Sequence, residues 1–249
     1  MEITLQGKIA VVTGAAGQIG RVIVRTLAAC GADIAVCYLH SEAMAASLAQ
    51  EVRAMGCRAV AVKADVTEEE SVGNMRDAIK AALGNPDIVV NNAVIQYAWK
   101  PILDQSLADF QSQFDSCVLQ SVLTAKAFLP AMIEKGGGRF IGVNTECSAL
   151  CRANSGAYAS AKRGMDGLYR VLAKEVGAAG VTVNQVAPGW TVSDNDRAKG
   201  IDAAKGYGVP LGRRGTDQEV ANAVAFLASD LASYITGVCL PVSGGSVMV

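Results

Sequence analysis

The sequence predicts an α/β protein built on one doubly wound parallel sheet of about seven strands with helices on both faces. Two observations carry this prediction. Short apolar segments alternate with longer amphipathic ones along the whole chain, as in parallel sheets. No linker, repeat or low-complexity stretch interrupts that order, so residues 1–249 are expected to form a single domain.

Composition narrows the class of protein. Hydrophobic residues make up 51% of the chain, charged residues 18%, and the net charge is −1. These values are typical of a globular protein with a large core and argue against nucleic acid as a partner. No uncharged apolar run is long enough to predict a membrane span, and the polar start of the chain does not resemble a signal peptide. We therefore expect a cytoplasmic protein.

The cysteines and the histidine also favour a cytoplasmic protein. The chain has seven cysteines, none in a CxxC spacing, and a single histidine, His40. An odd number of scattered cysteines fits a reducing compartment better than a disulfide scaffold or a zinc site. No metal centre is predicted.

The first predicted strand, 9–13, leads into a glycine-rich turn and a helix at 21–30. Glycines in this context allow a tight turn and let a pyrophosphate approach the helix N-terminus, where free N–H groups favour anions. This is the dinucleotide site of a Rossmann fold. The predicted cofactor residues of the turn are Gly14, Gly17, Gln18, Ile19 and Gly20.

The second strand, 34–38, decides between the two nicotinamide cofactors. An acidic residue at its end would bind the ribose 2′-hydroxyl of NAD. The expected position is Tyr38, and no acid follows it. His40, Ser41 and Arg21 are candidates for contact with a 2′-phosphate. We therefore expect NADP to be preferred, with NAD as the alternative, although His40 also fits an ordinary loop position.

The next elements are a helix at 42–55, a strand at 58–63 and a strand at 87–91. Thr67 to Glu70 has the pattern of a capping box that opens a helix. Asp65 fits either a turn residue or an adenine contact at the strand's carboxyl end. Asn92 and Ala93 follow the strand at 87–91, where ligands bind in such sheets, and both are predicted to face the cofactor.

Residues 96–104 form a predicted loop, followed by a long helix at 107–134, a strand at 139–143 and a helix at 155–178. Tyr158 and Lys162 lie four residues apart on this last helix, so they share one face. A neighbouring cation lowers the pKa of a phenol, which normally titrates near ~10. Such a phenol can transfer a proton during a reaction, although any Tyr-x-x-x-Lys alone has weak specificity.

A strand at 182–186, a segment without clear periodicity and a final strand at 238–242 complete the chain. The segment between the strands is long for a connection, and we expect 190–212 to form a lid over the site. Thr216 to Glu219 predicts the capping box of the last main helix.

Together these residues resemble the short-chain dehydrogenase/reductase family, of the 3-oxoacyl-carrier-protein-reductase-like type. The resemblance covers essentially the whole chain. It is carried by the glycine turn that follows Thr13, by Asp65-Val66, by Asn91-Asn92-Ala93, by Tyr158 with Lys162, and by Pro188-Gly189.

The resemblance implies the roles of the catalytic residues. The tyrosine would protonate the forming alkoxide while NAD(P)H delivers hydride, and the lysine would lower the tyrosine's proton affinity and hold the nicotinamide ribose. The serine that the family places thirteen positions before the tyrosine is Thr145 here, with Ser148 as the alternative. Asp65 and Val66 would contact the adenine. The remaining implied cofactor contacts are Pro188, Gly189, Thr191 and Ser193.

Besides Thr145, further positions depart from the family pattern, among them Ser243, which replaces an aspartate. The asparagine that anchors a relay water falls on Cys117, whose thiol is a weak donor and poor acceptor. Val94 replaces the last glycine of the Asn-Asn-Ala-Gly motif and adds volume beneath the cofactor. Ser193 replaces a threonine. Cys117 and Val94 keep a non-catalytic nucleotide-binding sensor open as an alternative to an enzyme.

The substrate is less well specified. Gln96, Trp99, Glu146 and Trp190 are the candidate substrate contacts. Glu146 fits either a hydrogen bond to a polyhydroxylated substrate or a solvated loop charge. We expect a small polar ketone, sugar or polyol, with a 3-oxoacyl thioester as the alternative. The resemblance also implies a homotetramer.

Overall fold

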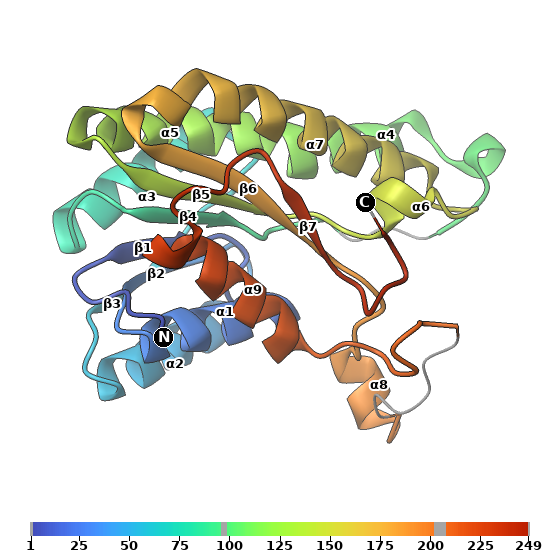
Figure 1. Cartoon of the computed structure of the whole chain (residues 1–249), viewed down its shortest axis with the longest axis horizontal. Coiled ribbons are helices and arrows are strands. Elements are labelled where there is room, and N and C mark those ends of the chain that lie inside the picture. The colour runs from blue at the N-terminus through green and yellow to red at the C-terminus, as the bar shows by residue number, and fades with distance from the viewer. Residues whose placement is uncertain (1, 96–98, 202–207, 249) are drawn as a thin grey trace.

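A sheet of seven parallel strands lies between two layers of helices (Figure 1). The computed structural model describes residues 2–95, 99–201 and 208–248. The strand order is β3-β2-β1-β4-β5-β6-β7, so the chain winds outward in both directions from the junction of β1 and β4. This arrangement confirms the predicted doubly wound Rossmann sheet. The strands are β1 (Ile9–Val12), β2 (Asp33–Tyr38), β3 (Ala59–Lys63), β4 (Ile88–Asn91), β5 (Gly138–Val143), β6 (Val181–Pro188) and β7 (Cys239–Val242).

Helices cover both faces of the sheet. On one face lie α1 (Gln18–Ala29), α2 (Glu42–Ala54) and α9 (Asp217–Ala228). On the other lie α3 (Glu69–Ala82), α5 (Gln120–Lys135) and α7 (Gly156–Val176), with α4 (Leu107–Phe114) running into α5 (Figure 1). Two short helices, α6 (Cys147–Leu150) and α8 (Asp194–Ala198), follow β5 and β6 at the carboxyl edge of the sheet.

The central strands show why their sequences are continuous apolar runs. Successive residues of a strand point to opposite faces. In β1, Val12 packs under α1 and α2, whereas Val11 packs under α3 and α5. In the neighbouring β4, Val90 packs on the same face as Val12, and Val89 packs on the same face as Val11. Both faces are covered, so every position is apolar.

One predicted detail is wrong. Thr67 to Glu70 does not form a capping box: α3 begins at Glu69 behind an N-cap, Glu68, that makes no side-chain cap. The Thr67 hydroxyl instead donates to Asp65 Oδ1 at 2.6 Å. The long helix predicted at 107–134 is confirmed as Leu107–Lys135, and it contains a π-helical turn, Asp115–Leu119. The capping box at Thr216 is also confirmed, because its hydroxyl accepts from the Glu219 N–H.

The long interrupted helix bears on the membrane prediction. By length and composition, Leu107–Lys135 could cross a bilayer, a feature that the sequence analysis did not anticipate. However, 56% of its most apolar window is buried inside the fold, where it packs against the sheet. This is the behaviour of a core helix.

Candidate active site

A cavity of about 1120 Å³ opens along the carboxyl edge of the sheet. Parallel strands deliver their following loops to that edge, so segments distant in sequence meet there. Among the predicted site residues, the cavity is lined by Gly14, Gly17, Gln18, Ile19, Gly20, Tyr38, His40, Ser41, Asp65, Val66, Asn92, Ala93, Trp99, Thr145, Glu146, Tyr158, Lys162, Pro188, Gly189, Trp190, Thr191 and Ser193. Gln96 lies outside the described residues.

The glycine turn is too tightly packed for side chains. Gly14 has a φ of +59°, and a Cβ there would lie 2.8 Å from the Cα of Ala93. A Cβ on Gly20 would lie 2.3 Å from the carbonyl oxygen of Gly14. The N-cap of α1 is Gly17, which provides no side-chain cap, and the first turn holds no acidic residue. The open N–H groups and the helix dipole at this cavity wall suit a pyrophosphate, so the turn fits a dinucleotide.

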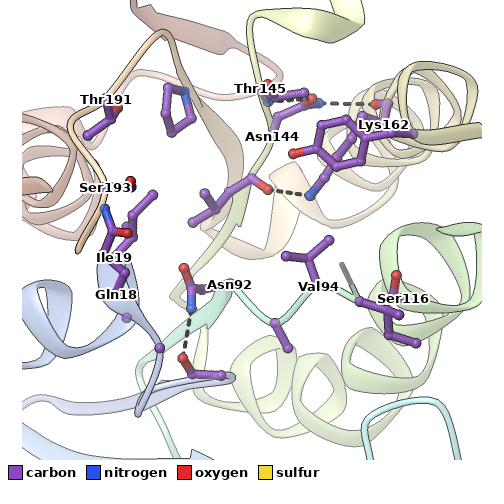
Figure 2. A pocket seen from close by; sticks show the side chains of 18 of the residues that line it. Gln18, Ile19, Asn92, Val94, Ser116, Asn144, Thr145, Lys162, Thr191 and Ser193 are labelled. Carbon is purple, nitrogen blue, oxygen red and sulfur yellow. Dashed lines mark hydrogen bonds between the residues drawn. The ribbon is translucent and has the colours of Figure 1, made fainter. Parts of the chain in front are cut away.

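Asn92 fixes that turn from the neighbouring strand. Its Nδ2 donates to the carbonyl oxygens of Thr13 and Gly14, both at 3.0 Å. In return, the Thr13 hydroxyl accepts from the N–H groups of Asn92 and Ala93 at 3.0 and 3.1 Å. Figure 2 shows Asn92 between the α1 residues Gln18 and Ile19 and the opposite wall. The Asn92 amide therefore holds the glycine turn in place, and Asn92 itself lines the cavity.

The far end of the cavity lies beyond β2. Tyr38 closes the strand, and His40 and Ser41 are exposed beside it. Ser41 is the N-cap residue of α2, yet its hydroxyl makes no cap bond. Arg21 is not among the described residues that line the cavity, and its guanidinium pairs with Asp194 of α8. The expectation that Arg21 contacts a 2′-phosphate is therefore not supported.

Asp65 serves as a turn residue. Its Oδ1 accepts from both the N–H and the hydroxyl of Thr67, at 2.9 and 2.6 Å. The same residue and Val66 line the cavity. The turn role is established, and it is compatible with an adenine contact through the rest of the side chain.

Thr145 presents a hydroxyl that can donate to a ligand. The residue is buried and follows β5, and its Oγ1 accepts from the N–H of Cys147 at 3.2 Å. That leaves the hydroxyl proton to donate into the cavity. The alternative, Ser148, is absent from the cavity wall and donates its hydroxyl to the carbonyl of Thr145 at 2.9 Å. The geometry favours Thr145.

Lys162 lies behind Tyr158. Its Nζ is 5.9 Å from the centroid of the tyrosine ring and donates to the carbonyl of Val143 at 2.7 Å. Burial lowers the pKa of Lys162, and the nearby Cys117 thiol opposes that effect. Asn144 ties β5 to α7 by donating to the Lys162 carbonyl at 3.1 Å, a contact that Figure 2 shows.

The π-helical turn changes which residue faces the cavity. Cys117, at the position expected for the relay asparagine, is fully buried and does not line the cavity. The preceding residue, Ser116, does line it. Within the described chain, the Ser116 hydroxyl is buried without a hydrogen-bond partner. The extra residue of a π turn rotates the helix face locally, a shift that counting along the sequence cannot detect.

The substrate end is flanked by two tryptophans. Trp99 is 50% exposed, and its ring centroid lies 6.1 Å from that of Tyr158. On the other side, the Arg214 guanidinium lies 5.2 Å from the ring of Trp190. Arg214 also donates to the carbonyl of Thr191 at 2.8 Å. It therefore fixes the chain that follows β6.

Glu146 is not a solvated loop charge. It is buried, and its Oε1 accepts from Arg152 Nη2 at 2.9 Å. Burial raises the pKa of Glu146, and Arg152 counteracts the shift. Arg152 and Arg214, both on the cavity wall, were missed in the sequence because neither belongs to a motif.

The segment predicted as a lid is anchored at its start. Gln18 Nε2 donates to the carbonyl of Val192 at 3.0 Å and to Asp217 at 2.8 Å. Ser193 caps α8, and its hydroxyl donates to Asp196 at 2.7 Å. Residues 202–207 of this segment lie outside the described chain.

Comparisons with known proteins identify the family. A family model described as Enoyl-(Acyl carrier protein) reductase matches residues 14–246. The chain is 38% identical over 254 residues to the 3-oxoacyl-[acyl-carrier-protein] reductase FabG of Escherichia coli K12, covering 99% of this chain and 100% of the relative. The chain belongs to the short-chain dehydrogenase/reductase family.

Solved structures of this family agree with the fold. A blue fluorescent protein from a metagenomic library, in complex with NADPH, superposes with a TM-score of 0.90 at 35% identity, over 98% of this chain and 100% of that one. A 7α-hydroxysteroid dehydrogenase with NADH and 7-oxo glycochenodeoxycholic acid gives 0.90 at 31%, over 99% and 97%. A Burkholderia cenocepacia gluconate 5-dehydrogenase with NADP and tartrate gives 0.89 at 31%, over 98% and 96%. The protein is a short-chain NAD(P)-dependent oxidoreductase acting on carbonyl or CH–OH groups.

Proposed function

We propose that the protein interconverts a small polar ketone, sugar or polyol with its alcohol or carbonyl partner, using Thr145, Tyr158 and Lys162. The observation that carries the proposal is their convergence on one cavity wall, opposite a glycine turn that fits a dinucleotide. The bound nicotinamide would supply or accept the hydride.

The three side chains have distinct roles in this proposal. Thr145 donates a hydrogen bond to the reacting oxygen, while its own oxygen accepts one from the Cys147 N–H. Tyr158 gives that oxygen its proton in reduction and removes it in oxidation. Lys162, 5.9 Å from the Tyr158 ring, favours the phenolate that remains after the proton leaves.

NADP is the proposed preferred cofactor. The end of β2 carries no acid that would repel a 2′-phosphate, and His40 and Ser41 are exposed at the start of α2. A helix N-terminus without a side-chain cap attracts a phosphate. Solved relatives with NADPH, NADP and NADH show that the family accommodates either cofactor. Comparing KM for NADPH and NADH tests the preference.

The polar substrate end supports a small hydrophilic substrate. Glu146 and Arg152 line the cavity next to Thr145, and Trp99 and Trp190 flank it. The solved gluconate 5-dehydrogenase binds tartrate, a small polar compound. A second candidate function is reduction of a 3-oxoacyl thioester, favoured by the full-length identity to FabG.

A substrate screen tests the function. NADPH oxidation is followed against small ketones, ketoses and acetoacetyl-coenzyme A, with Tyr158→Phe as the inactive control and Tyr234→Phe, an exposed tyrosine, as the matched one. The proposal expects turnover of a polar ketone that Tyr158→Phe loses and Tyr234→Phe keeps. Turnover of acetoacetyl-coenzyme A alone would favour the second candidate. Cofactor binding without turnover on any compound would overturn both.

Three broader features complete the proposal. The chain works as a single domain in the cytoplasm, and 190–201 with 208–212, the described parts of the predicted lid, close over the substrate. It assembles as a homotetramer, with α4, α5 and α7 facing other copies. Exposed apolar side chains on these helices support the assembly: Leu107, Phe114 and Val171.

A further inference from the structure

Arg152 retains unused hydrogen-bond donors on the substrate side of the cavity. In the described chain its guanidinium has one partner, Glu146, which accepts from Nη2. The Arg152 side chain is 46% exposed, whereas that of Glu146 is 5% exposed. An arginine carries five N–H donors in a planar fork. Most of this fork is therefore free to bind a ligand.

The other described cations of the cavity wall are committed elsewhere. Lys162 is buried, and its Nζ donates to the Val143 carbonyl. Arg214 is also buried, and its Nη2 donates to the carbonyl of Thr191 and to Asp196 at 2.8 and 2.7 Å. Arg152 is thus the cation best placed for a negative group on the substrate.

The position of Arg152 is fixed at both ends. At its backbone, the carbonyl accepts from the Ser155 hydroxyl at 2.7 Å. At its head, Glu146 is itself immobilised: its N–H donates to the Pro188 carbonyl at 2.9 Å, and its Oε2 packs so closely on Gly189 that a Cβ there would lie 2.8 Å away. An arginine held in this way loses little freedom on binding a ligand.

We propose that Arg152 binds a carboxylate of the substrate, and that the substrate is a small hydroxy acid or the keto acid formed from it. This inference rests on the proposed function and narrows its substrate class. A carboxylate matches the guanidinium fork and accepts two parallel hydrogen bonds. Glu146 directly follows Thr145, so a carboxylate at Arg152 and a reacting oxygen at Thr145 belong to one short molecule.

Glu146 acts as the positioning residue for Arg152. It takes one N–H of the guanidinium and leaves the others for the ligand. A buried carboxylate is tolerated because it is paired, so removing Arg152 alone would leave an uncompensated charge. The double variant Arg152→Gln with Glu146→Gln avoids that problem and keeps two hydrogen-bonding side chains.

Binding to the NADPH-saturated enzyme tests the inference independently of turnover, because the reduced cofactor cannot oxidise an alcohol. Gluconate and sorbitol are a suitable pair, since they differ in a carboxylate against a hydroxymethyl group. Isothermal titration is expected to show wild type binding gluconate at least about tenfold more tightly than sorbitol, as a charge-assisted bidentate contact provides. Arg152→Gln and the double variant lose this difference. Arg152→Lys, which keeps the charge without the fork, retains part of it.

The control is Arg25→Gln, which breaks a comparable pair with Glu51 between α1 and α2, outside the cavity wall. It should bind gluconate as wild type does. Equal binding of gluconate and sorbitol by wild type, no binding of gluconate, or an unchanged preference in both Arg152→Gln variants would each overturn the inference. If Arg152→Gln instead lowers only acetoacetyl-coenzyme A turnover, the anion is a phosphate of the thioester and the inference also fails. Tyr158-dependent turnover of neutral ketones without a carboxylate preference would leave the proposed function standing.

Discussion

Thr145 is the residue on which the proposed chemistry is most directly testable. Replacing it with valine removes the hydroxyl and keeps the β-branched shape, so the reacting oxygen loses one hydrogen-bond donor. Loss of one such donor typically lowers kcat by about 10²–10³. We expect that fall in kcat/KM for Thr145→Val and a much smaller change for Thr145→Ser, measured by NADPH oxidation.

Ser148 is the matched control. Its hydroxyl bonds the Thr145 carbonyl and does not line the cavity. Ser148→Ala should therefore keep kcat/KM within a few-fold of wild type. If Ser148→Ala is the more damaging change, the assignment of the donor to Thr145 is wrong.

Glu146 predicts a pH dependence of stability. Burial raises its pKa above the usual 4.5, so the folded protein holds this proton more tightly than the unfolded chain. Between 4.5 and the raised pKa the folded state carries more protons, and its stability falls as pH rises. The slope from one group is at most about 1.4 kcal/mol per pH unit.

Urea unfolding across this pH window measures the effect. Glu146→Gln removes the titrating group, so its free energy of unfolding should rise relative to that of wild type as pH increases. Glu51→Gln is the control, because pairing with Arg25 lowers the pKa of Glu51 instead. A constant difference between Glu146→Gln and wild type at all pH values would contradict the prediction.

Residues inside motifs could be placed from the sequence, whereas residues outside them could not. Gly14 follows a predicted strand, and Tyr158 and Lys162 lie on a predicted helix, so their meeting at one edge was predictable. Arg152 and Ser116 reach the cavity through a loop and a π-helical turn. Sequence periodicity carries no signal for either feature, so these two residues emerge only in three dimensions.

At the scale of elements, the β1–α1 turn depends on close backbone contacts. A Cβ on Gly20 would lie 2.3 Å from the carbonyl oxygen of Gly14 and 2.8 Å from Asn92 Nδ2. Backbone atoms cannot move aside as a flexible side chain can, so Gly20→Ala should distort the β1–α1 turn. We expect NADPH affinity to fall by about tenfold or more, corresponding to at least ~1.4 kcal/mol.

Gly73→Ala is the comparison for that variant. Gly73 lies within α3, and a Cβ there meets no atom within 4 Å. Alanine in a helix interior is favoured over glycine by roughly 0.8–1 kcal/mol. Gly73→Ala should raise the free energy of unfolding and leave the NADPH dissociation constant unchanged. Unaltered cofactor affinity in Gly20→Ala would show that the turn tolerates a side chain.

Helix boundaries show where element prediction succeeds and fails. The capping box at Thr216 was predictable because α9 begins directly behind it. Thr67 carries the same kind of pattern, yet its hydroxyl is taken by Asp65, and α3 starts later. A local competitor for the capping hydroxyl therefore decides the outcome. Such competition depends on loop conformation, which the spacing of residues does not specify.

At the scale of the whole molecule, the sheet topology follows from the order of elements. Alternating strands and helices, joined by right-handed crossovers, leave few arrangements open, and the observed order β3-β2-β1-β4-β5-β6-β7 is one of them. The same topology gathers the loops after β1, β2, β3, β4, β5 and β6 around one cavity. The assembly of several copies depends instead on surface side chains.

The proposed homotetramer gives a prediction at that scale. Val171 on α7 is 52% exposed, and Leu107 at the start of α4 is 87% exposed, on the helical layer that we expect to face other copies. Burial of such side chains favours association, and a buried unpaired charge opposes it. Light scattering after size exclusion should give wild type about four times the 25.7 kDa chain mass, and Val171→Asp a smaller species. Met44→Asp, which changes an exposed apolar residue on α2 across the sheet, should leave the mass unchanged. A monomeric wild type, or an intact tetramer in Val171→Asp, would exclude α7 as the contact face.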